Sequence, residues 1–312
     1  MKHTDSKVTV FAPASIANVS CGFDIFGFAV ENLGDIVDAR FNDTGKIIIE
    51  TIEGADGLPF EPEQNVTTVA AKALLDEIGE KRGVTFNLKK TVMPGSGLGS
   101  SSSAAVAGAF AVNELLGNPF SKRELLKFAG VGEQLASNQL HFDNVAPSLL
   151  GGFSVVRSNE EMDVLSIDYP SDLKIVIAHP QVEVKTKQAK RMLGRTMSIS
   201  NAVIQFGNVS GLVLGLTSKD YNLIGRSMVD MLAEPVRSKL IPLYNEAKQA
   251  TLDAGAIGTN IAGSGPTIFS FCKGEDSAKT VLKAIKKVYA HSELEVNYYI
   301  SNINPEGAKR IK

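Results

Sequence analysis

The chain has 312 residues, a formal net charge of −2, 44% hydrophobic residues and 28 glycines. This composition excludes a disordered chain, a collagen-like repeat and a small disulfide scaffold, and it supplies enough apolar residues for a sizeable core. Because Lys and Arg do not outnumber Asp and Glu, nucleic acid and anionic membranes are not expected as main partners. The length predicts about two domains.

The cysteines and the N-terminus bear on the compartment. Cys21 and Cys272 stand far apart in no paired motif, which argues against a disulfide framework and favours a reducing environment. Residues 1–7 are polar and lack the apolar stretch of a secretory signal. The longest run of small apolar residues, 104–112, is far shorter than the roughly 20 residues of a membrane span. We therefore expect a cytoplasmic protein.

The first half of the chain mixes strand and helix patterns. Strands follow from β-branched content or apolar–polar alternation, and helices from apolar residues three and four positions apart. In chain order these patterns predict strands over 8–12 and 47–52, a helix over 66–78, a strand over 84–92, a helix over 100–116, a helix from 121 to about 135, and strands over 151–157, 164–167 and 173–178. The third helix begins at a capping box formed by Ser121 and Glu124.

The second half is richer in helices. In chain order it predicts helices over 200–216, 221–232 and 238–254, a strand over 257–261, a turn over 263–266, a strand over 267–272, a helix over 277–289 and a strand over 294–300. The elements lack the steady strand–helix alternation of a Rossmann fold. We therefore expect an α+β protein of two domains, with a boundary near residues 155–170.

The sharpest motif is the loop Pro94-Gly95-Ser96-Gly97-Leu98-Gly99, which four serines follow at a predicted helix start. A helix N-terminus offers unpaired N–H groups and partial positive charge. Glycines let the backbone approach a phosphate, and serine hydroxyls can donate to phosphate or ligate Mg²⁺. The spacing matches neither Walker A nor the dinucleotide motif. A plain glycine turn before a buried helix is the alternative, but it leaves the four serines unexplained.

A dense polar cluster follows the third predicted helix and leads into Pro147 and two glycines. Its members are Glu133, Gln134, Ser137, Asn138, Gln139, His141, Asp143 and Asn144. A solvated loop explains each residue singly, whereas a cluster closed by Pro and Gly-Gly is typical of a loop that faces a substrate. His141 has no His or Cys at ligand spacing, so a zinc site is not expected.

Taken together, these segments resemble one family. The glycine loop with its serines is similar to the phosphate loop of the GHMP kinases, and residues 12–27, 141–152 and 234–242 resemble the homoserine kinases of that superfamily. The resemblance implies the GHMP kinase fold: residues 1–165 form an ATP-binding domain like ribosomal protein S5 domain 2. Residues 166–312 then form a ferredoxin-like domain, whose last strand can return to the first.

The resemblance also implies a reaction, in which ATP phosphorylates the hydroxyl of L-homoserine to give O-phospho-L-homoserine for threonine biosynthesis. It implies Mg²⁺ on Ser101 and Glu133. Implied at ATP are Asn65, Pro94, Gly95, Ser96, Gly97, Leu98, Gly99, Ser100, Ser101 and Ser102. Implied around homoserine are Asn18, Asp24, His141, Asn144, Lys190, Arg237 and Gly263. Thr186, with Asn144 and Glu133, is implied at the phosphoryl-transfer centre.

The residue types suit that chemistry. Asp24 can pair the substrate ammonium, and Arg237 can clamp its carboxylate. Asn18 and Asn144 can fix the hydroxyl, and since an amide is no base, we expect catalysis by positioning and electrostatics. Asp143 is the alternative, because mevalonate kinases carry an Asp as base and the register could shift by one residue.

Two departures from the family bear on substrate choice. Lys190 stands where the homoserine kinases have an Arg, with Arg191 beside it, and Lys lacks the planar fork for a carboxylate. Ser20 and Cys21 stand where Gly-Pro is common. Other readings are a GHMP kinase for another small hydroxyl substrate such as mevalonate, and a non-catalytic metabolite-binding member of the fold. A homodimer is one option for the assembly.

Overall fold

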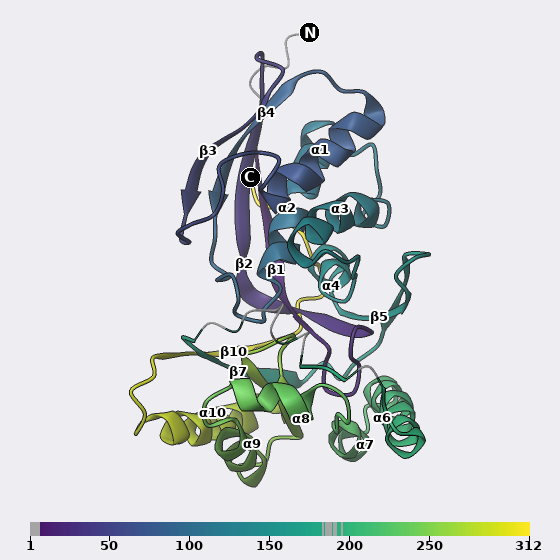
Figure 1. Cartoon of the computed structure of the whole chain (residues 1–312), viewed down its shortest axis with the longest axis vertical. Helices are drawn as coiled ribbons and strands as arrows, with labels where there is room; N and C mark the ends of the chain where they lie inside the picture. Colours follow the sequence, from purple (N-terminus) through teal and green to yellow (C-terminus); the bar gives the residue numbers. More distant parts are fainter. Residues whose placement is uncertain (1–6, 183, 185–188, 190–191, 195) are drawn as a thin grey trace.

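The computed structural model describes residues 7–182, 184, 189, 192–194 and 196–312. Figure 1 shows two sheets, one above the other: α1 to α4 cover one face of the upper sheet, and the later helices lie beneath the lower one. Each sheet thus buries one face under helices, which is the α+β arrangement expected from the sequence.

The first sheet and its helices come mainly from the first half of the chain. Its strands are β1 (Lys7–Ala17), β2 (Phe26–Asn42), β3 (Ile47–Glu53), β4 (Gly83–Lys89), β5 (Phe153–Ser158), β6 (Asp163–Ile167) and β11 (Lys309–Arg310). Its helices are α1 (Val66–Ile78), α2 (Ser100–Leu115), α3 (Leu125–Ser137) and α4 (Val145–Leu150). The strand order is β11-β1-β2-β4-β3, and β5 pairs with both β2 and β6.

The second sheet has the order β10-β7-β9-β8. Its strands are β7 (Leu173–Pro180), β8 (Gly258–Ile261), β9 (Ile268–Lys273) and β10 (Val296–Ser301). Its helices are α6 (Ile199–Ser218), α7 (Tyr221–Ser227), α8 (Glu234–Arg237), the 3-10 helix η1 (Ser238–Leu240), α9 (Tyr244–Asp253) and α10 (Gly274–Tyr289). The last predicted strand, β10, stays in this sheet, and the chain returns to the first sheet through β11.

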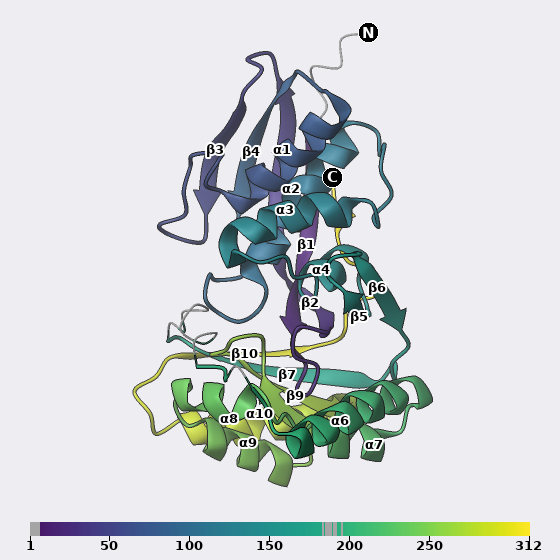
Figure 2. The ribbon, with the colours of Figure 1, turned by 45° about the vertical axis from the view of Figure 1, so that its right-hand side comes forward.

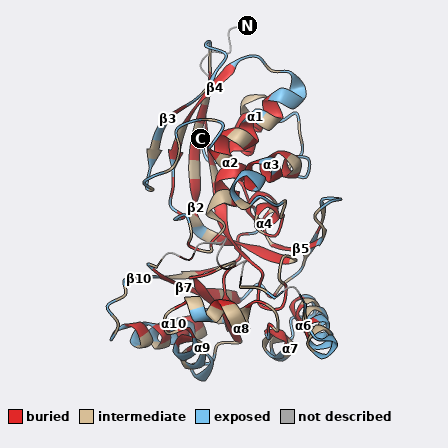
Figure 3. Cartoon of the chain, viewed as in Figure 1, coloured by how far each residue is buried: buried red, intermediate tan, exposed pale blue. Residues whose placement is uncertain are grey.

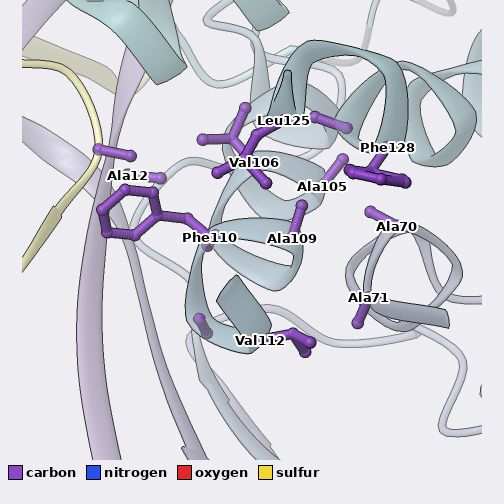
Figure 4. Packing of buried hydrophobic residues seen from close by; sticks show 14 of the residues in the cluster. Ala12, Ala70, Ala71, Ala105, Val106, Ala109, Phe110, Val112, Leu125 and Phe128 are labelled. Carbon is purple, nitrogen blue, oxygen red and sulfur yellow. The ribbon is translucent and has the colours of Figure 1, made fainter. Parts of the chain in front are cut away.

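The small residues of α2 let it lie deep in the first half of the molecule. Ala105 and Ala109 are fully buried, and Figure 4 shows the small side chains of α2 beside Ala70 and Ala71 of α1. A Cβ at Gly108 would come within 2.0 Å of the Thr67 carbonyl oxygen. Close packing of this kind holds the N-terminus of α2 rigidly.

The structure corrects several sequence predictions. The long strand β2 was missed, because its residues 30–35 are mostly polar or turn-forming and Asn32 adopts a left-handed backbone with φ of 61°. The supposed polar loop over 141–152 contains α4. The helix predicted over 221–232 ends at Ser227, and the helix over 238–254 is broken before Tyr244, where Leu243 has φ of 57°. The other predicted elements are present with shifted ends.

α6 differs from the other helices in exposure. Figure 3 shows α2 buried along its length and α6 largely exposed. Among the described helices, α6 is long and apolar enough to cross a membrane, judged by length and composition alone, and 22% of that stretch is buried. Core helices of soluble proteins meet the same two criteria.

Candidate active site

A cavity of about 360 Å³ opens where the two halves of the molecule meet. Its walls come from the loop before α2, the C-terminal end of α3, the start of α4, the loop after β1 and the turn after β8. Figure 2 shows the loop between β4 and α2 reaching toward the second sheet. Hydrogen bonds fix that loop on both sides, from Ser15 N to the Leu98 carbonyl (3.1 Å) and from Thr267 Oγ1 to the Ser96 carbonyl (2.6 Å).

The glycines of the loop are required by backbone conformation and by space. Gly95, Gly97 and Gly99 have φ of 76°, 82° and 66°, values that other residues rarely adopt. A Cβ at Gly97 would lie 2.5 Å from the Ala262 carbonyl oxygen, and one at Gly99 would lie 2.3 Å from Ser15 Oγ. Gly99 is the N-cap of α2 and has no side chain to cap it. The first turn of α2 lies at the cavity, because Ser100, Ser101 and Ser102 line it, and the N-terminus of a helix favours an anion.

The four serines divide into two pairs. Ser100 Oγ donates to the Val92 carbonyl (2.6 Å) and Ser103 Oγ to Asp35 Oδ2 (2.6 Å), so these two secure the helix start. Ser102 Oγ donates to Glu133 Oε2 at 2.7 Å. Ser101, Ser102 and Glu133 all line the cavity. The structure therefore adds Ser102 as the hydroxyl that holds the Glu133 carboxylate, a contact that the sequence reasoning did not include.

A buried ion pair beneath the loop was also missed. Lys90 Nζ contacts Asp35 Oδ2 and donates to the Ser100 carbonyl at 2.9 Å, and the two side chains are only 5% and 1% exposed. Asp35 also accepts from Thr91 N at 3.1 Å. The pair joins β2 and the end of β4 to the first turn of α2.

Elsewhere on the cavity wall, two segments share one acceptor, the carbonyl oxygen of Gly263. Asn18 Nδ2 and Arg237 Nη1 both donate to the Gly263 carbonyl oxygen, each at 2.9 Å. Asn18 Oδ1 accepts from Asp24 N at 3.0 Å, and Asp24 Oδ2 lies 3.8 Å from His141 Nδ1. Asn18 and Asp24 have left-handed backbones, with φ of 69° and 56°. Asp24, His141 and Arg237 therefore meet in one place, although they are far apart in sequence.

Arg237 has the environment of an anion receptor. Its side chain is buried, and burial lowers its pKa while the charges of Asp24, Asp230 and Asp143 oppose that shift. An arginine guanidinium keeps its charge in proteins, so Arg237 presents a cation. Among the described residues its Nε has no hydrogen-bond partner. A buried guanidinium with an unused donor on a cavity wall fits a carboxylate ligand.

Asp143 and Asn144 both reach the cavity. Burial, aided by the charges of Asp24 and Glu133, raises the pKa of Asp143 to about 7. Asn144 Oδ1 accepts from Ser15 Oγ at 2.9 Å, which orients its amide. A carboxyl that titrates near neutrality therefore stands beside an oriented amide.

The cavity brings together most of the residues singled out in the sequence. Those lining it are Asn18, Asp24, Asn65, Pro94, Gly95, Ser96, Gly97, Gly99, Ser100, Ser101, Ser102, Glu133, His141, Asn144, Arg237 and Gly263. Leu98, within the loop, is buried and does not line the cavity. Thr186 and Lys190 lie outside the described residues. Asn65 caps α1 through Oδ1, which accepts from Thr67 N at 3.0 Å.

Comparisons with known proteins agree with this architecture. The family model described as "GHMP kinases N terminal domain" matches residues 65–152, and that described as "GHMP kinases C terminal" matches residues 212–291. The solved structure of mevalonate kinase from L. major shares the fold, with a TM-score of 0.72 at 15% identity, 96% of this chain and 97% of that chain being covered. The fold and the site define an ATP-dependent kinase of the GHMP type.

Relatives with higher sequence identity show which family of GHMP kinases the chain belongs to. The homoserine kinase of Chlorobaculum tepidum is 40% identical over 317 residues, covering 97% of this chain and 98% of the relative. That of Pyrococcus abyssi is 40% identical over 304 residues, covering 97% and 99%. The crystal structure of homoserine kinase from Cytophaga hutchinsonii superposes with a TM-score of 0.97 at 45% identity, covering 100% of this chain and 99% of the other. The chain belongs to the homoserine kinase family.

Proposed function

We propose that this protein transfers the γ-phosphoryl group of ATP to the side-chain hydroxyl of L-homoserine, giving O-phospho-L-homoserine for threonine biosynthesis. The observation that carries the proposal is the pairing of opposite charges at one end of the cavity. Asp24 and the buried Arg237 both line it, together with the glycine loop. A substrate with an ammonium and a carboxylate needs both groups, and its hydroxyl then points toward the phosphate loop.

In this proposal, the loop over residues 94–102 holds the phosphates through backbone N–H groups and serine hydroxyls. The ion pair of Lys90 with Asp35 and the packing of Gly97 on Ala262 keep the loop in place before ATP arrives. Asn65 stands at the base side of the nucleotide, where its amide already caps α1. The protein therefore supplies fixed donors rather than covalent chemistry, as phosphoryl transfer requires.

Mg²⁺ completes the phosphate site in our proposal. The wall offers oxygen donors from Ser101, Ser102 and Glu133, which suit Mg²⁺ because it prefers oxygen and keeps only one or two protein ligands beside phosphates. We assign Ser101 and Glu133 as its ligands. The hydrogen bond from Ser102 to Glu133 holds the carboxylate at the cavity wall. When bound, the ion neutralises charge on the transferred phosphoryl group.

The remaining groups position the acceptor. We assign Asp24 to the ammonium, Arg237 to the carboxylate, and Asn18 and Asn144 to the hydroxyl, with His141 beside Asp24 and the Gly263 carbonyl as the shared acceptor that orients Asn18 and Arg237. Thr186 at the transfer centre and Lys190 at the carboxylate stay predictions from the resemblance. The reaction proceeds in this proposal by positioning and electrostatics, without a strong protein base.

A substrate panel tests the function. ADP release is measured with Mg-ATP and either L-homoserine, mevalonate, L-serine or L-threonine. We expect release that depends on homoserine. Release with mevalonate alone would favour a GHMP kinase for that substrate, although mevalonate has no ammonium and leaves Asp24 without a role. If no compound supports release, the chain is a non-catalytic member that binds metabolites.

The assembly is part of the same proposal. We assign residues 1–165 to the ATP-binding domain and 166–312 to the C-terminal domain, in a cytoplasmic enzyme that binds neither membrane nor nucleic acid. We also propose a homodimer that covers the exposed apolar side chains of α6, among them Ile199, Val203 and Phe206. Light scattering of the purified protein and of a Phe206→Lys variant measures the mass of each. A monomeric parent protein would contradict the dimer.

A further inference from the structure

The two segments that carry the amino-acid-binding groups are held together by buried amides that none of the site predictions include. One segment is the loop over residues 18–24 after β1, which ends in Asp24. The other runs over residues 230–237 and ends in Arg237. On the cavity side, both meet at the Gly263 carbonyl oxygen. On the far side, side chains from α6 and β8 bridge them.

Gln205 of α6 is the first bridge. Its Nε2 donates to the Cys21 carbonyl at 2.7 Å and to Asp230 Oδ1 at 3.1 Å, and its Oε1 accepts from Met231 N at 2.8 Å. The side chain is buried at 7% exposure. Both amide protons and the amide oxygen are thus used, so neither a carboxylate nor a hydrocarbon of the same length reproduces these bonds.

The bond to Asp230 carries this restraint to Arg237. Asp230 Oδ2 accepts from Ala233 N (3.0 Å) and Glu234 N (2.8 Å). Arg237 N in turn donates to the Ala233 carbonyl at 2.9 Å. Gln205 therefore fixes the carboxylate that anchors the start of α8, whose last residue is Arg237.

Asn260 of β8 is the second bridge, and it joins the same two segments from another side. Its Nδ2 donates to Ser20 Oγ at 3.1 Å and to Glu234 Oε2 at 2.8 Å. The loop needs such support, because Ser20 and Asp24 have φ of 60° and 56°. Left-handed backbone at residues other than glycine persists only where its surroundings impose it.

We propose that Gln205 and Asn260 are positioning residues that set the separation of Asp24 and Arg237, and so tune the site for a substrate that carries an ammonium and a carboxylate. The inference rests on the proposed function. It places neither amide in contact with substrate. Their effect is to remove the need to order the two segments when the amino acid binds, which lowers the KM for the amino acid but not the KM for ATP.

The test compares Gln205→Met, Asn260→Leu and the double variant with a matched control, Asn113→Leu. Asn113 is as deeply buried, and its amide bonds Asn118 Oδ1 (3.2 Å) and both the carbonyl (2.9 Å) and the N–H (3.1 Å) of Phe120, near the C-terminal end of α2. We expect each bridging variant to raise the KM for homoserine about tenfold and the double variant further. The KM for ATP stays within about twofold, and Asn113→Leu lowers thermal stability without moving either KM.

A second measurement separates this inference from the proposed function. Hydrogen exchange of the substrate-free protein, followed by mass spectrometry, reports on residues 18–24 and 230–237 directly. We expect faster exchange there in Gln205→Met than in Asn113→Leu. If the parent protein does not phosphorylate homoserine, the proposed function fails and this comparison alone decides the inference. Unchanged exchange, or KM values for homoserine and ATP that rise together, overturns it.

Discussion

Replacing Asp143 by Asn tests both the electrostatics of the cavity and the absence of a protein base. Burial and the charges of Asp24 and Glu133 raise the pKa of Asp143 to about 7 in the folded protein, whereas an aspartate in an unfolded chain has a pKa of about 3.9. Between these values the folded protein holds a proton that the unfolded chain has released. Stability is therefore fully present below about pH 4 and falls as the pH rises to about 7.

The magnitude follows from that difference of about three pKa units. Each unit corresponds to about 1.36 kcal/mol, so ionisation of Asp143 lowers the free energy of unfolding by about 4 kcal/mol at pH 8 relative to pH 4. Asn keeps the shape of the side chain and does not titrate. We expect Asp143→Asn to be about 4 kcal/mol more stable than the parent at pH 8 and to differ little near pH 4.

Urea unfolding of both proteins across this pH range, without Mg²⁺ or nucleotide, measures the effect. An Asp56→Asn variant is the control, because Asp56 is exposed. A stability difference that does not change with pH, or an Asp143→Asn protein less stable than the parent at pH 8, refutes the electrostatic reasoning. The same variant should keep its turnover within about tenfold. A loss of about a thousandfold in a folded protein that still binds homoserine shows that Asp143 is the base.

Three further substitutions test the carboxylate site, the glycine loop and the ion pair beneath that loop. Arg237→Lys removes the planar guanidinium that can bind a carboxylate through two hydrogen bonds. Steady-state kinetics should then show a kcat/KM for homoserine at least about 30-fold lower, with the KM for ATP unchanged. Equal effects on both substrates would contradict the role of Arg237 at the homoserine carboxylate. Gly97→Ala introduces a Cβ 2.5 Å from the Ala262 carbonyl oxygen, at a backbone φ of 82°. We therefore expect calorimetry to show weaker ATP binding and thermal unfolding to show a loss of about 2 kcal/mol in stability. Unchanged ATP affinity would contradict the role of the loop in ATP binding. Lys90→Met leaves Asp35 buried without its charged partner, and urea unfolding should show a loss of about 3–5 kcal/mol. An unchanged free energy of unfolding would contradict a stabilising role for the pair.

Local signals in the sequence predicted the phosphate end of the site well. Gly95, Gly97 and Gly99 are needed because of the backbone angles at their own positions, and the serines directly after them begin a helix. A segment of about ten residues therefore shows both the loop conformation and the groups that can bind phosphate. The predicted hydrogen bond of the capping box is equally local and is present, since Ser121 N donates to Glu124 Oε2 at 2.8 Å. The helix itself starts later than predicted, at Leu125. Sequence patterns predict best those structural features that depend only on neighbouring residues in one segment.

The contacts that sequence reasoning missed join residues far apart in the chain. Lys90 meets Asp35 across 55 positions, and Gln205 reaches Cys21 across 184. Ser102 faces Glu133 only because α2 and α3 pack side by side, and the family resemblance named Ser101 instead. Such pairs depend on how strands and helices are arranged, and no local period encodes that arrangement. The strand β2 was missed for a related reason, since its polar residues 30–35 are accommodated only by an irregularity against β1 near Pro13 and Ser15.

The short pairing of β11 with β1 has a consequence for synthesis. Val10 and Phe11 of β1 pair with Arg310 and Lys309, and Thr9 N donates to the carbonyl of Lys312 at 3.0 Å. The β1 edge of the first sheet therefore stays unpaired until residues 309–312 have emerged from the ribosome. An open edge strand invites pairing with other chains. Deleting residues 309–312 should thus increase aggregation of the nascent enzyme, even though these residues lie far along the chain from the glycine loop.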